Sequence, residues 1–125
     1  MKADLLRATF AFLLVFAVGI DAMSARTIDV CKDCRVTSIR EGIRLAEPYD
    51  TLLIGKGYYR EYNILVDKPL SLIGEGYPII DGEEQGEVIR VVADDVRIQG
   101  FAIRNVGVSY TSDHAAIRVV QSEGF

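Results

Sequence analysis

The sequence predicts an all-β fold, a right-handed parallel β-helix with a short capping helix in front of it. From Asp50 onward, short runs of Ile, Val and Leu are separated by Gly, Pro, Asp or Asn. Apolar residues alternate within many of these runs, which is typical of strands with one buried face. The runs also recur as a set every 24 to 28 residues. Such a period indicates a solenoid whose turns stack their apolar interiors on one another.

The repeat is visible in the letters themselves. The tetrapeptide IRVV occurs at 89–92 and again at 117–120, and NILVDKPLSLIG aligns one turn earlier. The aligned pairs are Ile64 with Ile89, Val66 with Val91, Leu70 with Val96, Leu72 with Ile98, and Gly74 with Gly100. A β-sandwich is the alternative fold, but it would not explain the identical tetrapeptide or the shared glycines. The longer later turn places 106–114 in a loop that projects from one corner.

The N-terminus has the layout of a secretory signal peptide. Lys2 and Arg7 precede an apolar run over 8–20, and small residues follow. The run is too short to span a membrane, although a helical anchor is the alternative interpretation. We expect residues 1–24 to be removed, by cleavage after Ser24 or Ala25, leaving a periplasmic protein without a membrane span.

Charge and size narrow the class of protein. The segment 1–24 carries two basic and two acidic residues, so the net charge stays at −4 after cleavage. Nucleic-acid binding calls for a basic face, and the composition therefore argues against it. The remaining length suits one domain with a modest core.

Residues 25–49 form the expected lead-in and capping helix. In TSIREGIRLAEP, Ser38 and Glu41 have the spacing of a capping box, and Pro48 closes the segment. Its apolar stripe consists of Ile39, Gly42, Ile43 and Ala46. We expect this helix to cover the N-terminal end of the coil and its strand edges. Residues 50–125 form the β-helix, which stops part-way through a turn, so we expect the chain to be the N-terminal piece of a longer protein.

The order of the segments resembles the N-terminal part of the NosD family. The segments are CKDC, TSIREGIRLAEPYDTLLIGKGYYRE, NILVDKPLSLIGEGYPIIDG and ADDVRIQGFAIRNVGVSYTSDHAAIRV. KPLSLIGEG and PIIDG occur widely among β-helix proteins, whereas the last segment and the leading CxxC are more particular. The resemblance implies a non-enzymatic periplasmic factor that helps assemble the copper-sulfur centre of nitrous oxide reductase. It also implies work with an ABC transporter of the inner membrane.

The only two cysteines, Cys31 and Cys34, have three interpretations. An inert disulfide would close a short loop and stabilise little. A contact to Cu(I) is chemically reasonable because this soft ion accepts as few as two thiolates. Redox work usually places the first cysteine at a helix N-terminus, and here the predicted helix begins several residues later.

The projecting loop is the expected place for partner specificity. Inserted loops of solenoids usually lie on a binding face, and this one holds Ser109, Tyr110, Asp113 and His114. His114 is the only histidine, and its imidazole could contribute to a copper site or to a partner contact.

Two further clusters define the alternative functions. YYREY, with Tyr58, Tyr59 and Tyr62, could stack on sugar rings or pack a corner of the coil. Asp81, Arg104 and Asp113 suggest a β-helix lyase acting on acidic sugars, which needs carboxylates and a proton-abstracting base on one face. Because these charges do not recur as an acidic column, we expect no enzyme. The runner-up is a carbohydrate-binding or lyase-type protein, and the third hypothesis is a nonfunctional fragment.

Overall fold

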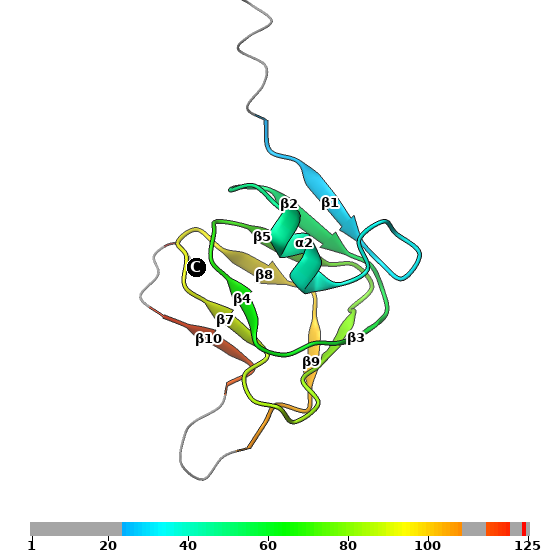
Figure 1. Cartoon of the computed structure of the whole chain (residues 1–125), viewed down its shortest axis with the longest axis vertical. Coiled ribbons are helices and arrows are strands. Elements are labelled where there is room, and N and C mark those ends of the chain that lie inside the picture. Colours follow the sequence, from blue (N-terminus) through cyan, green and yellow to red (C-terminus); the bar gives the residue numbers. More distant parts are fainter. Residues whose placement is uncertain (1–23, 109–114, 121–123, 125) are drawn as a thin grey trace, which may run out of the picture.

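A computed structural model describes residues 24–108, 115–120 and 124, and it shows a parallel β-helix of about four turns (Figure 1). The described part contains a single helix, α2 (Ile39–Leu45). The strands are β1 (Thr27–Val30), β2 (Thr51–Ile54), β3 (Tyr58–Arg60), β4 (Ile64–Val66), β5 (Ser71–Gly74), β6 (Ile79–Asp81), β7 (Ile89–Val91), β8 (Arg97–Gln99), β9 (Ala102–Arg104) and β10 (Ile117–Val119). The predicted fold class is confirmed.

The strands form three parallel sheets that are the sides of the coil. Their orders are β1-β2-β5-β8, β3-β6-β9 and β10-β7-β4. The pairing joins Ile64 to Ile89, Leu72 to Ile98 and Ile117 to Ile89, which is the register that the sequence repeat predicts. Each turn from β2 onward therefore supplies one strand to each side, and residues about one period apart lie directly above one another.

Two strands were not predicted. β1 lies inside the expected lead-in segment and pairs with β2, with Thr27 opposite Thr51 and Val30 opposite Ile54. β3 comes from the tyrosine cluster. Each is short, and only Val30 of β1 and Tyr59 of β3 are buried, so neither shows the apolar alternation of the later runs. The first turn of the coil consists of β1, a loop and α2.

Helix α2 begins where expected, but only half of the capping box forms. Ser38 Oγ accepts a hydrogen bond from the Glu41 N–H at 3.1 Å, as an N-cap does. The Glu41 carboxylate pairs with Arg44 on the exposed side of the helix instead of turning back. A carboxylate from elsewhere in the chain, that of Glu61, takes the remaining donors at this helix end.

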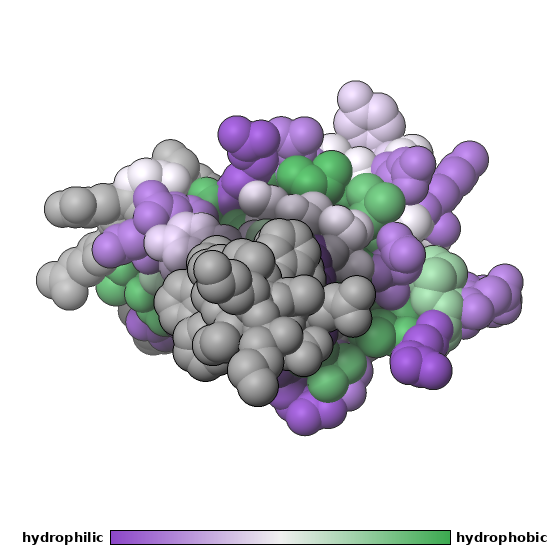
Figure 2. Space-filling view, turned by 90° about the horizontal axis from the view of Figure 1, so that it is seen from above, coloured by the Kyte–Doolittle hydropathy of each residue, from purple (hydrophilic) through white to green (hydrophobic). Residues whose placement is uncertain are grey.

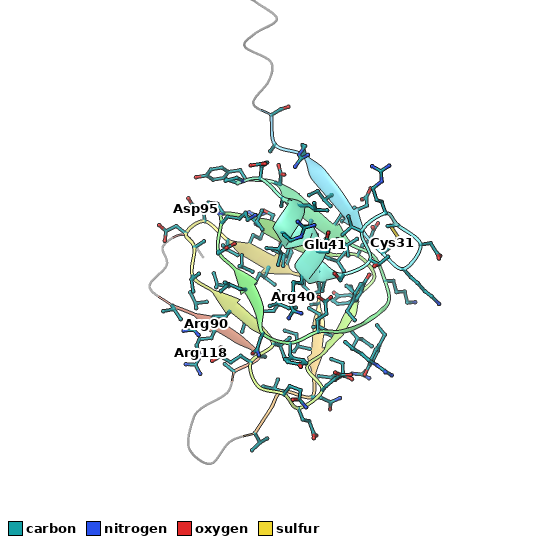
Figure 3. The ribbon with its side chains drawn as sticks, in the orientation of Figure 1. Cys31, Arg40, Glu41, Arg90, Asp95 and Arg118 are labelled. Atoms are coloured by element: carbon teal, nitrogen blue, oxygen red, sulfur yellow. A yellow bond between two sulfur atoms is a disulfide. The ribbon has the colours of Figure 1, made fainter. Side chains whose placement is uncertain are left out.

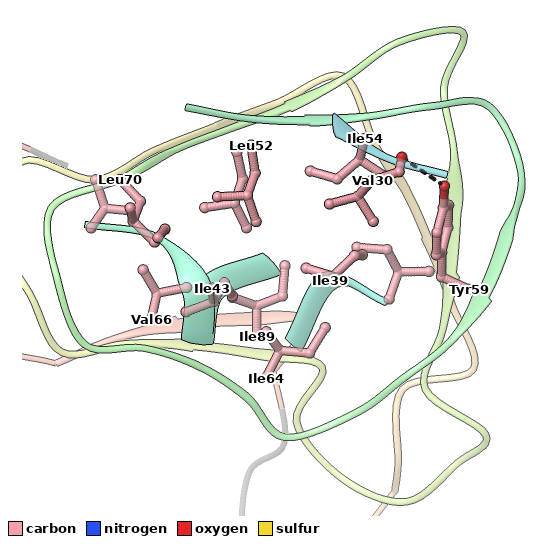
Figure 4. Close-up of a cluster of buried hydrophobic side chains, with 14 of the residues drawn as sticks. Val30, Ile39, Ile43, Leu52, Ile54, Tyr59, Ile64, Val66, Leu70 and Ile89 are labelled. Atoms are coloured by element: carbon pink, nitrogen blue, oxygen red, sulfur yellow. Dashed lines mark hydrogen bonds between the residues drawn. The ribbon is translucent and has the colours of Figure 1, made fainter. Parts of the chain in front are cut away.

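The helix closes one end of the apolar interior (Figure 4). Ile39, Gly42 and Ile43 are buried, and α2 contacts β1, β2 and β4. Gly42 allows a close approach, since a Cβ there would lie 2.7 Å from Leu52 Cδ2. Below it the coil is filled by fully buried side chains of successive turns, which are Leu52, Ile54, Ile64, Val66, Leu72, Ile80, Ile89 and Val91. Burial of one such side chain stabilises the fold by about 1.5 to 3 kcal/mol.

Gly74 and Gly100 stack closely at one corner of two successive turns. A Cβ on Gly74 would lie 2.2 Å from the carbonyl oxygen of Gly100, and Gly100 has a φ of +83°. Side chains are excluded at both positions because the two backbones touch at this corner. This close contact explains why glycine occurs at both of these aligned positions of the repeat.

Polar residues predominate on the face of the coil that Figure 2 shows. Seen from the side of β1 in Figure 2, hydrophilic residues make up most of the coloured surface, with apolar residues scattered among them. Within the described ranges, no helix has the length and apolar character needed to cross a membrane.

Candidate functional site

The two cysteines lie in a loop at the corner that follows β1. Figure 3 shows Cys31 in this loop, which projects beyond the end of the strand. The structure joins Cys31 and Cys34 in a disulfide, with their Cα atoms 5.0 Å apart. Both side chains are half-buried, whereas Lys32 and Asp33 between them are exposed. The disulfide therefore lies near the surface, in a loop whose middle residues face solvent.

The loop is held by backbone contacts on both sides. Cys31 N–H donates to the Val36 carbonyl at 3.2 Å, and Cys34 N–H donates to the Cys31 carbonyl at 3.2 Å. In the next turn, Gly55 N–H donates to the Val30 carbonyl at 2.8 Å. A Cβ on Gly55 would lie only 3.3 Å from Cys31 Cβ. The disulfide loop therefore rests directly on the corresponding corner of the second turn.

Helix α2 offers its N-terminal donors to Glu61 and not to the cysteines. The Glu61 carboxylate accepts from Ile39 N–H at 2.8 Å and from Arg40 N–H at 3.0 Å. A thiolate gains from a helix dipole only when it occupies this position. The redox interpretation of the cysteines therefore has no support from the helix.

A groove of about 500 Å³ opens between the disulfide loop and the second turn. Its lining residues are Lys32, Thr37, Lys56, Gly57, Tyr58 and Tyr59. Tyr59 is buried, and its hydroxyl donates to the Gly55 carbonyl at 2.8 Å. Burial raises the pKa of Tyr59, with the nearby Glu61 carboxylate adding to the effect. Tyr59 thus forms the floor of the groove, while Tyr58 is exposed at its edge.

The tyrosine cluster divides between packing and exposure. Tyr59 packs the corner, as one of the two interpretations of YYREY holds. Tyr58 is 50% exposed, its hydroxyl donates to Asp81 Oδ2, and the Arg60 guanidinium lies 5.8 Å from the centre of its ring. Tyr62 is half-buried, and its carbonyl accepts a hydrogen bond from Arg40 Nη2.

Asp81 and Arg104 do come together, in neighbouring turns of one sheet. The register places Arg60, Asp81 and Arg104 in one row across β3, β6 and β9. The Asp81 carboxylate is buried and accepts hydrogen bonds from Tyr58 Oη, from Glu83 N–H at 2.8 Å and from Asn105 Nδ2 at 3.0 Å.

These donors, the Tyr58 hydroxyl first, lower the pKa of Asp81, and the hydrogen bond to Asp81 raises that of Tyr58. Asp81 is thus occupied in tying three turns of the coil together. Asp113, the third residue of the lyase hypothesis, lies outside the described residues.

Two buried carboxylates near the first turn escaped the sequence analysis. Glu61 serves the helix that begins 22 residues before it, and Asp50 accepts from Arg26 N–H at 2.7 Å and Glu47 N–H at 2.9 Å. Burial by itself would raise the pKa of Asp50. These hydrogen bonds and the Arg26 guanidinium outweigh burial and hold that pKa below its usual value. No local pattern predicts the contacts of Glu61 with Ile39 or of Asp50 with Arg26, because these partners lie 22 and 24 residues away.

Most of the expected partner loop falls outside the part of the chain that the structure describes. Ser109, Tyr110, Asp113 and His114 all lie outside the described residues. Among the residues that the structure does describe, no three His, Cys, Asp or Glu side chains gather as a group suited to a metal ion.

No protein-family profile, curated protein or solved structure matches the chain. The class of protein is therefore the one that the fold itself defines, an all-β parallel β-helix with one short helix at its first turn.

Proposed function

We propose that this chain is an exported accessory protein similar to the NosD family, which handles copper during assembly of the copper-sulfur centre of nitrous oxide reductase. The resemblance in the sequence supplies the biological role. The observation that carries the proposal on the side of the structure is the half-buried cysteine pair, held at a corner by contacts within the first two turns. The protein binds and docks, and it is not an enzyme.

The chemistry requires the reduced form of the pair. Cu(I) is a soft ion that prefers thiolates, and two of them are enough to hold it. Cys31 and Cys34 lie in one tight turn, so the backbone that lets the sulfurs bond to each other also brings two thiolates to one ion. Both are half-buried, which leaves a path for transfer of the ion to another protein.

The proposed partners are nitrous oxide reductase and an ABC transporter of the inner membrane, and the proposed compartment is the periplasm. Disulfides form and persist in that compartment, so copper binding there requires that a thiol–disulfide reductant first supply two electrons and two protons to the Cys31–Cys34 bond. The N-terminal signal pattern and the cysteine loop support this placement.

A titration of the chain with Cu(I) under reducing conditions tests the proposal. We expect one ion per chain, and no tight uptake by the oxidised protein or by the Cys31→Ser/Cys34→Ser variant. His114→Ala removes the other predicted copper ligand. Comparing its Cu(I) uptake with that of the wild type shows whether the histidine contributes to the site. Absence of uptake by the reduced chain, or equal uptake by the double serine variant, would overturn the proposal.

A further inference from the structure

The groove between the disulfide loop and the second turn has the lining of an anion site. Lys32 and Lys56 approach it from successive turns, and among the described residues neither ammonium group has an ion-pair or hydrogen-bond partner. Each lining residue is neutral or basic. The charge of the groove is therefore available to a ligand, although the chain as a whole is acidic.

The two lysines are placed by the stacking of the coil. Lys32 is carried by the disulfide loop, which rests on Gly55. Lys56 follows Gly55 directly, and a Cβ on Gly76 in the third turn would lie 3.2 Å from Lys56 Cβ. The stem of Lys56 thus lies against the next corner, which limits the directions that its ammonium group can take.

Tyr58 adds a flat surface at the edge of the groove. Half of its side chain is exposed, and its hydroxyl is anchored by Asp81. An anchored ring loses little conformational entropy when a ligand stacks on it. Thr37, on the opposite side, contributes a hydroxyl that can donate or accept a hydrogen bond.

A second groove beside the disulfide loop, lined by Arg26, Asp29 and Cys34 among others, does not have the lining of an anion site. It measures about 570 Å³, but it contains the Asp29 carboxylate, and its Arg26 guanidinium is already paired with Asp50. An anion would meet repulsion and a committed cation there.

We propose that the groove lined by Lys32, Thr37, Lys56 and Tyr58 binds an acidic saccharide. The sugar ring stacks on Tyr58, its carboxylate lies between the two ammonium groups, and Thr37 contacts a sugar hydroxyl. An acidic peptide would be attracted by the lysines but would gain nothing from the ring, so the ring favours the saccharide. The groove is described for the oxidised chain, in which Cys31 and Cys34 form the disulfide.

Calorimetry of the oxidised full chain with trigalacturonic acid at low ionic strength tests the proposal. We expect binding that weakens about tenfold or more in Lys32→Gln/Lys56→Gln, because two charge-assisted contacts are lost. Tyr58→Leu keeps the apolar bulk without the ring and should weaken binding about fivefold. Arg90→Gln/Arg97→Gln removes the same charge from exposed positions of other sheets and should change nothing.

Three results would overturn the proposal. The first is no binding of trigalacturonic acid by the wild-type chain. The second is equal weakening by the Arg90→Gln/Arg97→Gln control, which would show only an effect of net charge. The third is equally strong binding of hexaglutamate together with full binding by Tyr58→Leu, which would make the groove a site for acidic peptides. Far-UV circular dichroism of each variant establishes that it is folded.

Discussion

The interior turn that carries β5, β6 and β7 and the last described turn of the coil bury the same kinds of residue to different extents. Leu72, Ile80 and Ile89 are fully buried, whereas their partners in the last turn, Ile98, Ile103 and Ile117, are only half-buried. At the first turn, α2 lies against β1, β2 and β4 and seals the interior. A solenoid side chain is thus fully removed from water only when a layer covers it on each side.

The largest expected effect contrasts one register pair across these turns. Leu72→Ala removes a fully buried side chain and should lower the free energy of unfolding by about 3 kcal/mol. Ile98→Ala, at the paired position, should cost about half as much because its side chain is already in partial contact with solvent. Urea denaturation of both variants measures the difference. Equal losses would show that the last turn is as well covered as the interior.

The second prediction concerns the seal of the first turn. Glu61→Ala leaves two N–H groups of α2 without their carboxylate, one of them buried, and should cost about 2 kcal/mol in urea denaturation. Glu41→Gln, on the exposed face of the same helix, should change little because solvent screens its pair with Arg44. If both variants lose the same stability, the cap by Glu61 does not hold the helix.

The disulfide should contribute less to the free energy of unfolding than either the Leu72 side chain or the cap by Glu61. It closes a loop of four residues, and the entropy that such a loop removes from the unfolded chain corresponds to at most about 2 kcal/mol. Cys31→Ser/Cys34→Ser should therefore stay folded, with a urea midpoint only modestly below that of the oxidised wild type. Complete unfolding of this variant would mean that the loop organises the whole first turn.

The smallest expected effect is a change in how the stability of the fold depends on pH in the acid range. Asp50 and Asp81 have pKa values lowered in the folded state, so their contribution to stability is present at neutral pH and is lost as pH falls below about 4. Asp50→Asn and Asp81→Asn should each flatten the fall of the urea midpoint between about pH 5 and pH 3. If the urea midpoint falls with pH as steeply in both variants as in the wild type, the lowered pKa values of Asp50 and Asp81 are contradicted.

The β-helix could be predicted because two signals in the sequence define it, a repeat along the chain and an apolar pattern within each short run. The register of Ile64 with Ile89 follows from matching letters, and the alternation within each run fixes the buried face. β1 escaped because TIDV buries only Val30, and its role depends on pairing with β2, which lies 24 residues away. Glu61 escaped for a related reason, since its partners belong to a helix earlier in the chain.

The candidate site was predicted only in its separate parts. The cysteine pair and the tyrosine cluster stand out in the sequence, but nothing local shows that the loop of the first turn rests on Gly55 of the second. That contact puts Lys32 beside Lys56 and creates the groove. The repeat period would have predicted that Lys32 lies near Lys56 only if β1 had been recognised as a strand of the coil.

X-ray absorption at the copper edge, on the reduced chain loaded with one equivalent of Cu(I), tests the proposed function most directly. We predict two sulfur ligands in the wild type and their loss in Cys31→Ser/Cys34→Ser. A spectrum with only nitrogen or oxygen ligands, or one that the double variant leaves unchanged, would contradict copper handling by the cysteine pair.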